Sequence, residues 1–213
     1  MLGIDVNEKS IDLAIVKLDK VELSRIDVGE AKYLRDRYFK KRRNIQRETS
    51  GNVRARLLSK YSGREGGRRV NAIPYKASKI TSEIVAEEKV KPVMEELKGI
   101  RRRIKYGKRV DRRLHSMPFR KAQTYISYKS MRHGFKPEFI RPKNTSKKCP
   151  ICGEVSKPNG HIFGCRKCGF QADRHLIAAW NIAAKLPMWG ALPLPPKATY
   201  EALAEVERIV IKC

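Results

Sequence analysis

Four cysteines form two closely spaced pairs in the last third of the chain, and their pattern implies metal chemistry. Cys149 and Cys152 make one Cys-x-x-Cys pair, Cys165 and Cys168 make the second, and a glycine follows each pair. Tetrahedral zinc needs four soft ligands, and each short turn can direct two thiolates at one ion. Glycine relieves the tight backbone of such a turn. The spacing therefore predicts a structural zinc ribbon over residues 149–168.

Two other uses of these cysteines are a pair of redox motifs and a set of buried free thiols. Two matched pairs within one short segment favour metal over both. His161 could in principle replace one cysteine ligand, although four cysteines are already present. The neighbouring Lys147 and Lys148 suggest that the ribbon contacts nucleic acid.

Two carboxylates lie in apolar segments that have the character of β-strands. Asp5 is inside the first apolar run, where an unpaired charge is costly, and Glu95 ends a later run. Hydrolysis of a phosphodiester without covalent catalysis needs hard oxygen ligands for two divalent metal ions. Asp5 and Glu95 are therefore candidate ligands for Mg²⁺ or Mn²⁺.

The net charge of the chain points to a polyanionic partner. There are 48 Lys and Arg against 22 Asp and Glu, which gives a formal charge of +26. Residues 32–79 contain sixteen basic and three acidic side chains, and residues 98–148 contain eighteen and two. One short cluster could equally be a solvated helix face, but two stretches of about fifty residues favour nucleic acid. The candidate nucleic-acid-binding residues are Arg42, Arg43, Arg101, Arg102, Arg103, Lys147 and Lys148.

Membrane association is not favoured by the sequence. It would call for a basic amphipathic helix with a broad apolar face or for a long apolar span, and neither is visible. The start of the chain lacks the basic and apolar regions of a signal peptide. We expect an intracellular, cytoplasmic protein.

Hydrophobic periodicity gives the elements that must position these residues. A meander of three strands comes first, followed by basic helices, a strand, a helix, a strand and a final amphipathic helix. This order predicts an α/β fold, an RNase H-like mixed sheet flanked by helices, with an inserted zinc ribbon. The predicted strands are 2–6, 11–16, 21–27, 90–94 and 139–140, and the predicted helices are 29–47, 53–61, 75–89, 119–132 and 173–186. The predicted divisions are 1–148 and 169–186 for the main α/β domain, 149–168 for the ribbon and 187–213 for a C-terminal tail.

Four segments carry a resemblance to a known family. They are Gly3-Ile4-Asp5, residues 94–100 (Met-Glu-Glu-Leu-Lys-Gly-Ile), Thr145-Ser146 leading into the first cysteine pair, and Ala178-Ala179-x-Asn181-Ile182. In order and character they resemble the RuvC-I, RuvC-II, zinc-ribbon and RuvC-III segments of the TnpB (OrfB) proteins of insertion sequences, which are relatives of type V CRISPR effectors. The resemblance covers roughly residues 1–186 and implies that the main α/β domain, residues 1–148 and 169–186, is RuvC-like.

The resemblance implies that Asp5 and Glu95, rather than the neighbouring Glu96, are two metal-binding acids of a RuvC-type nuclease. Family members usually read Asp-Arg-Asp-x-Asn-Ala-Ala at the third motif, whereas this chain has His175 in place of the second aspartate. Three alternatives follow: Asp173 supplies the third carboxylate, His175 acts as a ligand or base, or the site is impaired. Asp173 is also a good helix N-cap and needs no catalytic duty to occupy its place.

The activity implied by the resemblance is RNA-guided cleavage of DNA beside a transposon end, with DNA and a guide RNA or an RNA–DNA hybrid as partners. In the family, a region that helps to hold guide RNA precedes the first strand, and this sequence starts almost at that strand. One alternative is a non-catalytic DNA- or RNA-binding module that keeps the fold and the ribbon. Another is a ribosomal or transcription accessory with a zinc ribbon, which explains the charge but not Asp5 and Glu95.

The charge leads to a first prediction, that affinity for a nucleic acid falls steeply with salt. Phosphate contacts release counterions, so the logarithm of the binding constant should decrease linearly with the logarithm of salt concentration. A fluorescence-anisotropy titration between about 50 and 200 mM salt should show a loss on the order of a thousandfold. An affinity that stays flat over this range would contradict a polyanion as the partner.

Overall fold

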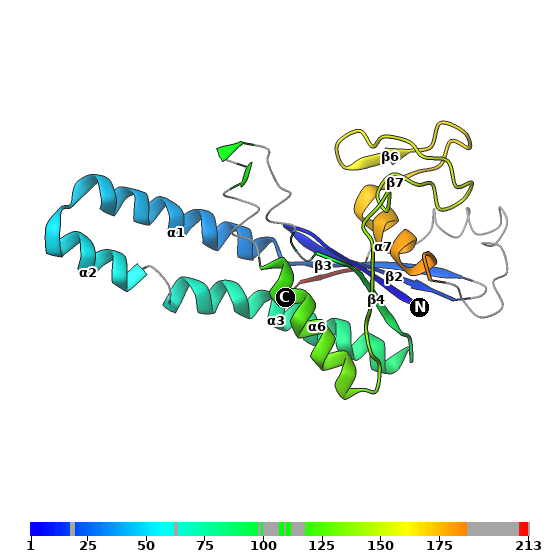
Figure 1. Cartoon of the computed structure of the whole chain (residues 1–213), viewed down its shortest axis with the longest axis horizontal. Coiled ribbons are helices and arrows are strands. Elements are labelled where there is room, and N and C mark those ends of the chain that lie inside the picture. Colours follow the sequence, from blue (N-terminus) through cyan, green and yellow to red (C-terminus); the bar gives the residue numbers. More distant parts are fainter. Residues whose placement is uncertain are drawn as a thin grey trace.

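A mixed β-sheet of six strands forms the centre of the computed structural model (Figure 1). The structure describes residues 1–17, 20–61, 64–97, 99, 107–108, 110–111, 118–186 and 209–212, with the backbone alone for 64–66 and 209–212. The strand order across the sheet is β5-β4-β1-β2-β3-β8. The strands are β1 (Leu2–Val6), β2 (Ser10–Val16), β3 (Val21–Asp27), β4 (Pro92–Glu95), β5 (Glu138–Ile140) and β8 (Ile209–Lys212).

The first three strands form an antiparallel meander, as their alternating and β-branched residues predicted. Strand β4 lies parallel to β1, and β5 lies parallel to β4. Parallel neighbours need long crossover connections, and helices supply both of them. The arrangement confirms the predicted α/β class and brings the carboxyl ends of β1 and β4 to one edge of the sheet.

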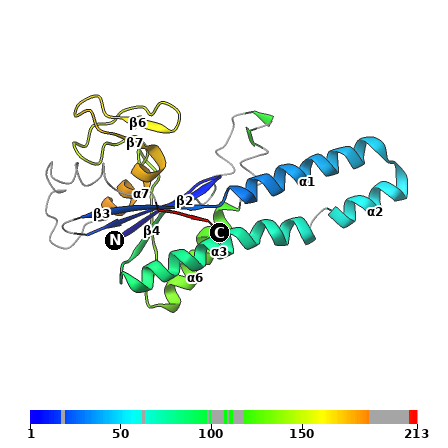
Figure 2. The same ribbon diagram turned by 180° about the vertical axis from the view of Figure 1, so that it is seen from behind.

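Helices cover both faces of the sheet (Figures 1 and 2). Helices α3 and α6 lie on one face, and α7 lies on the other beneath the ribbon. Helices α1 and α2, with the start of α3, extend to one side as an arm. The helices are α1 (Gly29–Glu48), α2 (Gly51–Tyr61), α3 (Arg64–Glu87), α6 (Phe119–Arg132) and α7 (Arg174–Ala184). None of the helices among the described residues is long and apolar enough to cross a bilayer.

A separate apolar core lies on each side of the sheet. On one side, Ile4 and Leu13 pack with Ile126 of α6. On the other, Ala14 packs with Trp180 of α7 and with residues of the ribbon. The ribbon's short strand β6 (Ile162–Gly164) pairs with β7 (Gln171–Asp173), and β7 runs directly into α7. The ribbon is therefore packed onto the main domain through α7.

Two details differ from the sequence prediction. Helix α3 begins at Arg64 rather than near Tyr75 and contains Pro74 in its interior. The core contacts of Ile73 and Ala77 hold the helix together on both sides of that proline. Helix α7 ends at Ala184 rather than at residue 186, so Ala184 is exposed whereas Ala183 is buried. Most of residues 99–118, for which no helix or strand was predicted, lies outside the described residues.

Helix α7 approaches the backbone of β1 very closely at Gly3. A Cβ atom at position 3 would lie 1.9 Å from the carbonyl oxygen of Ala179 and 2.7 Å from the backbone nitrogen of Ala183. Both obstacles are backbone atoms, so no side-chain rotation can relieve the clash. Only glycine at position 3 allows α7 to sit this close to the sheet.

This contact leads to a prediction for Gly3→Ala. The added methyl group must push α7 away from β1, and we expect a loss of at least about 3 kcal/mol in the free energy of unfolding, measured by urea denaturation. Gly67→Ala is the matched control, because a Cβ at that helical position meets nothing within 4 Å. That control should be neutral or up to about 1 kcal/mol more stable. Equal stability of the two variants would show that α7 is not fixed at Gly3.

Candidate metal site and nucleic-acid surface

Asp5 and Glu95 lie at the same edge of the sheet on adjacent parallel strands. The register pairs Ile4 with Met94, so the two acids are the next residues of β1 and β4. Successive side chains of a strand point to opposite faces, and Gly3 already faces α7, so Asp5 faces α7 as well. The pKa of Glu95 is raised by burial and further by the charge of Asp5, against the effects of Thr145 and Lys185. Two carboxylates that repel each other in this way favour a bound cation.

A third carboxylate beside this pair, Asp12, was not among the predicted site residues. It is the cross-strand partner of Asp5 and is fully buried. Ser10 Oγ donates to Asp12 Oδ2 at 2.5 Å, and Arg25 Nε donates to Asp12 Oδ1 at 2.5 Å. Burial raises the pKa of Asp12, while these two partners act to lower it. A charged residue in the apolar run of β2 was the available signal, by the same reasoning that selected Asp5.

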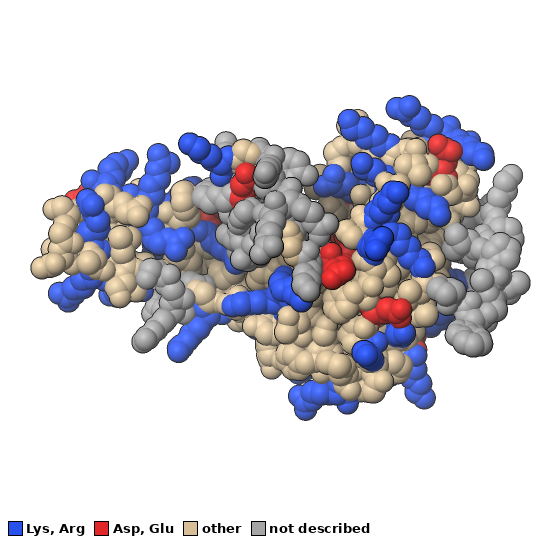
Figure 3. Space-filling view, in the orientation of Figure 1, with Lys and Arg blue, Asp and Glu red and all other residues tan. Residues whose placement is uncertain are grey.

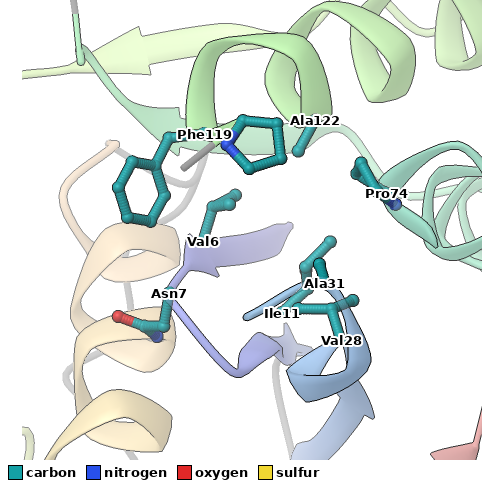
Figure 4. A pocket seen from close by; sticks show the side chains of 9 residues that line it. Val6, Asn7, Ile11, Val28, Ala31, Pro74, Phe119 and Ala122 are labelled. Carbon is teal, nitrogen blue, oxygen red and sulfur yellow. The ribbon is translucent and has the colours of Figure 1, made fainter. Parts of the chain in front are cut away.

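Asn7 joins the two aspartates. Its side-chain nitrogen donates to Asp5 Oδ2 at 2.8 Å and to Asp12 Oδ2 at 3.0 Å. Asn7 also lines a small, largely apolar hollow between the sheet, the start of α1, α3 and α6 (Figure 4). Val6, Pro74 and Phe119 are among the apolar residues of this hollow. Asn7 thus lines the hollow and also contacts both aspartates.

Asp173 lies at the start of α7 and is held by two partners through one oxygen. Its Oδ1 accepts a hydrogen bond from the backbone N–H of His175 at 2.8 Å, which is the N-cap interaction of the helix. The same oxygen forms an ion pair with Arg25 Nη2 at 2.9 Å. Burial acts to raise the pKa of Asp173, but the Arg25 guanidinium and the His175 N–H outweigh it and lower the pKa.

His175 reaches back to the first acid. Its ring Nδ1 lies 3.4 Å from Asp5 Oδ2, and both side chains are largely buried. The contacts thus form a closed ring that runs from Asp5 through Asn7, Asp12, Arg25, Asp173 and His175 back to Asp5. Two residues are candidates for the third metal ligand. His175 contacts Asp5. Asp173 instead forms an ion pair with Arg25.

The four predicted zinc ligands come together in the ribbon. Their sulfur atoms all lie within 4.8 Å of one another, with Cys149 Sγ 3.6 Å from Cys168 Sγ and Cys152 Sγ 3.4 Å from Cys165 Sγ. Burial raises the pKa of the Cys149 thiol to about 12. In Cys165, backbone N–H groups outweigh burial and lower the pKa to about 7. Within the described part of the chain, these cysteines are the one group of three or more metal-ligand side chains gathered this tightly.

Basic side chains occupy the two regions that flank the acids. Figure 3 shows Lys and Arg over the arm and over the ribbon, with a few acidic side chains between. Arg43 is exposed on α1, Arg42 is half-buried there, and Lys147 and Lys148 are exposed just before the first cysteine. Arg101, Arg102 and Arg103 lie outside the described residues.

Comparison with known proteins gives a family match and two long alignments. A family model described as Cas12f1-like, TNB domain, matches residues 119–182. A TnpB-like protein of Methanocaldococcus jannaschii is 35% identical over 204 residues, which cover 93% of this chain and 73% of that protein. A TnpB-like protein of Aquifex aeolicus is 32% identical over 162 residues, covering 70% of this chain and 51% of that protein.

The fold is also found in solved structures. A Cas12f1–sgRNA–target DNA complex superposes with a TM-score of 0.66 at 24% identity, covering 87% of this chain and 50% of that chain. A CRISPR–Cas12f ternary complex gives a TM-score of 0.61 at 20% identity, covering 85% and 38%. The chain thus spans half or less of the length of these proteins, and the likeness shows a shared fold.

The buried pair of Asp12 and Arg25 leads to a stability prediction. Arg25→Met should lower the free energy of unfolding by about 3–5 kcal/mol, because it leaves the Asp12 carboxylate buried without its cation. Urea denaturation measures the loss. Arg47→Met is the control, since Arg47 pairs with Glu48 at the exposed end of α1 and should contribute less than about 1 kcal/mol. Adding Asp12→Asn to Arg25→Met should restore much of the stability, and failure to do so would contradict this account.

Proposed function

Because the chain belongs to the family of TnpB-like proteins, as its motifs predicted, we propose that it is a transposon-associated nucleic-acid-binding protein with a RuvC-like, RNase H-like endonuclease domain. The observation that carries the proposal is the placement of Asp5 and Glu95 at neighbouring ends of parallel strands, facing α7. The raised pKa of Glu95 beside Asp5 fits a site that is completed by cations.

Asp5 and Glu95 would hold Mg²⁺ or Mn²⁺ at this edge of the sheet. Two such ions supply an activated water and stabilise the leaving oxygen of a phosphodiester. The chain's own contribution is to fix the carboxylates: Asn7 and His175 contact Asp5 Oδ2, and Thr145 donates to Glu95 Oε1. Carboxylates held in this way need little reorganisation when they take up a metal ion.

We propose Asp173 as the third metal-binding acid and give His175 a supporting role. Both contacts of Asp173 fall on Oδ1, and its low pKa keeps it ionised. His175 is a poor ligand for magnesium, which prefers oxygen, but its ring can orient Asp5 or a water.

The proposed partners are DNA and a guide RNA or an RNA–DNA hybrid, in a cytoplasmic setting. The Cas12f1 structure of the same fold is a complex with sgRNA and target DNA. The basic arm and the basic approach to the ribbon would contact phosphates on two sides of the acids. We assign zinc to the four cysteines, because four thiolates in tetrahedral reach of one ion are a structural zinc site.

One observation at the third metal-ligand position favours a second function, that of a nucleic-acid-binding module without nuclease activity. His175 stands where the family has an aspartate, and Asp173 is already paired with Arg25. A chain without a competent third ligand would be a nucleic-acid-binding module that retains the fold and the ribbon but does not cut.

Cleavage of labelled single- and double-stranded DNA by the zinc-loaded protein, with co-purified RNA retained, tests the proposal. We expect cutting that requires Mg²⁺ or Mn²⁺ and falls by at least a hundredfold in Asp5→Ala, because one metal ligand is lost. Glu83→Ala is the control, since Glu83 is an exposed residue of α3, which packs with α6 on the face of the sheet opposite α7. Tight binding without cutting in the wild type would favour the binding module.

A further inference from the structure

The segment that joins β5 to the ribbon, residues 141–148, is held along α7 by two side chains. Lys185 Nζ donates to the carbonyl oxygens of Arg141 and Lys143 at 2.7 and 2.8 Å. Asn181 Nδ2 donates to the carbonyl oxygens of Thr145 and Lys148, both at 2.7 Å. The segment has no strand partner over most of this length, so these side-chain donors take the place of a β-ladder.

Asn181 suits this task because its amide has two N–H donors. Both face backbone acceptors, and the side chain is 6% exposed. An aspartate of the same shape would direct oxygen atoms at these carbonyls and repel them. The amide therefore fixes the position of Thr145 relative to α7.

This arrangement directs the side chain of Thr145, which is only 5% exposed, toward Glu95. Its Oγ1 donates a hydrogen bond to Glu95 Oε1, across 50 residues of sequence. The backbone of Glu95 is fixed separately, since its carbonyl oxygen accepts from Gln123 Nε2 at 2.6 Å. Thr145 thus restrains the remaining freedom of Glu95, which is rotation of the carboxylate.

We propose that Thr145 is a positioning residue for Glu95, and that Asn181 holds Thr145 in place. This inference rests on the proposed function, in which Glu95 binds a divalent cation. With Oε1 engaged by the threonine hydroxyl, the carboxylate presents its other oxygen to the cation in one orientation. The Thr-Ser lead of the ribbon and the asparagine of the last helix, both picked out from the sequence, thereby acquire a shared role.

The same contacts join the ribbon and the acid site into one rigidly connected unit. Asn181 binds the carbonyl of Lys148, whose neighbour Cys149 is a ribbon ligand. On the other side, β7 of the ribbon ends at Asp173. A zinc ion held by the four cysteines would fix both ends of this unit and would thereby also support the geometry of the carboxylates.

Binding of Mn²⁺ to the full chain, measured by electron paramagnetic resonance, tests the proposal without relying on cleavage. Thr145→Val removes the hydroxyl at nearly constant volume, and we expect Mn²⁺ affinity to fall about 10- to 100-fold, as for other partners of metal ligands. Thr145→Ser keeps the donor and should retain affinity within about threefold. Thr124→Val is the matched control, because the Thr124 hydroxyl only bonds the backbone of its own helix. Zinc content and melting temperature are recorded for each variant.

Glu95→Gln separates this inference from the proposed function. Weaker Mn²⁺ binding in Glu95→Gln together with unchanged binding in Thr145→Val would leave the metal site standing and overturn the role of Thr145. Equal Mn²⁺ binding by the wild type and Glu95→Gln would overturn both. If Thr145→Val does not fold, Thr145→Ala and Asn181→Asp carry the same expectation, and wild-type Mn²⁺ affinity in folded forms of these two would contradict it.

Discussion

The guanidinium of Arg25 is shared by two carboxylates that belong to different layers of the protein. Its Nε bonds Asp12, which is fully buried in β2, and its Nη2 pairs with Asp173 at the start of α7. A buried aspartate without a cation would destabilise the sheet, and a helix start without a fixed cap would fray. One side chain on β3 meets both needs, and it sets the distance between the sheet and the end of α7 that faces the acids.

The need to pair buried carboxylates with cations also governs where the basic side chains near the acids lie. Carboxylates can gather at one edge of the sheet because nearby basic side chains compensate their charge. Arg25 on β3 compensates Asp12 and Asp173, and Lys185 at the C-terminal end of α7 compensates Glu95. Among the described residues, many other basic side chains are exposed on the arm and around the ribbon (Figure 3). Salt screens the attraction of these exposed charges for phosphates much more strongly than it weakens the buried pairs.

Much of the fold could be predicted from local sequence patterns, because alternation and helical periodicity are strong in this chain. The meander, α6 and the cysteine cluster lie where the residues indicated. The start of α3 could not be found, because tertiary contacts on both sides of Pro74 outweigh the local preference of proline. Asp12 itself had a local signal, but its pairing with Arg25 could not be predicted, because Arg25 lies opposite it only in the register in which β2 and β3 pair. Contacts across layers, such as Thr145 with Glu95, have no local signal at all.

Helix α7 connects the four-cysteine ribbon with the cluster of acids in one small domain. Its first turn carries Asp173 and His175 to the acids, and the positive end of the helix dipole favours carboxylates and phosphates at that place. Asn181 and Lys185, toward the C-terminal end of α7, donate to the backbone of the segment that leads to the ribbon. This segment is therefore held by the same rigid helix. Because Gly3 has no side chain, this helix packs directly against β1, the strand that bears Asp5. Because a helix of this length moves as one body, a displacement of the ribbon is transmitted to the sheet edge rather than absorbed between them.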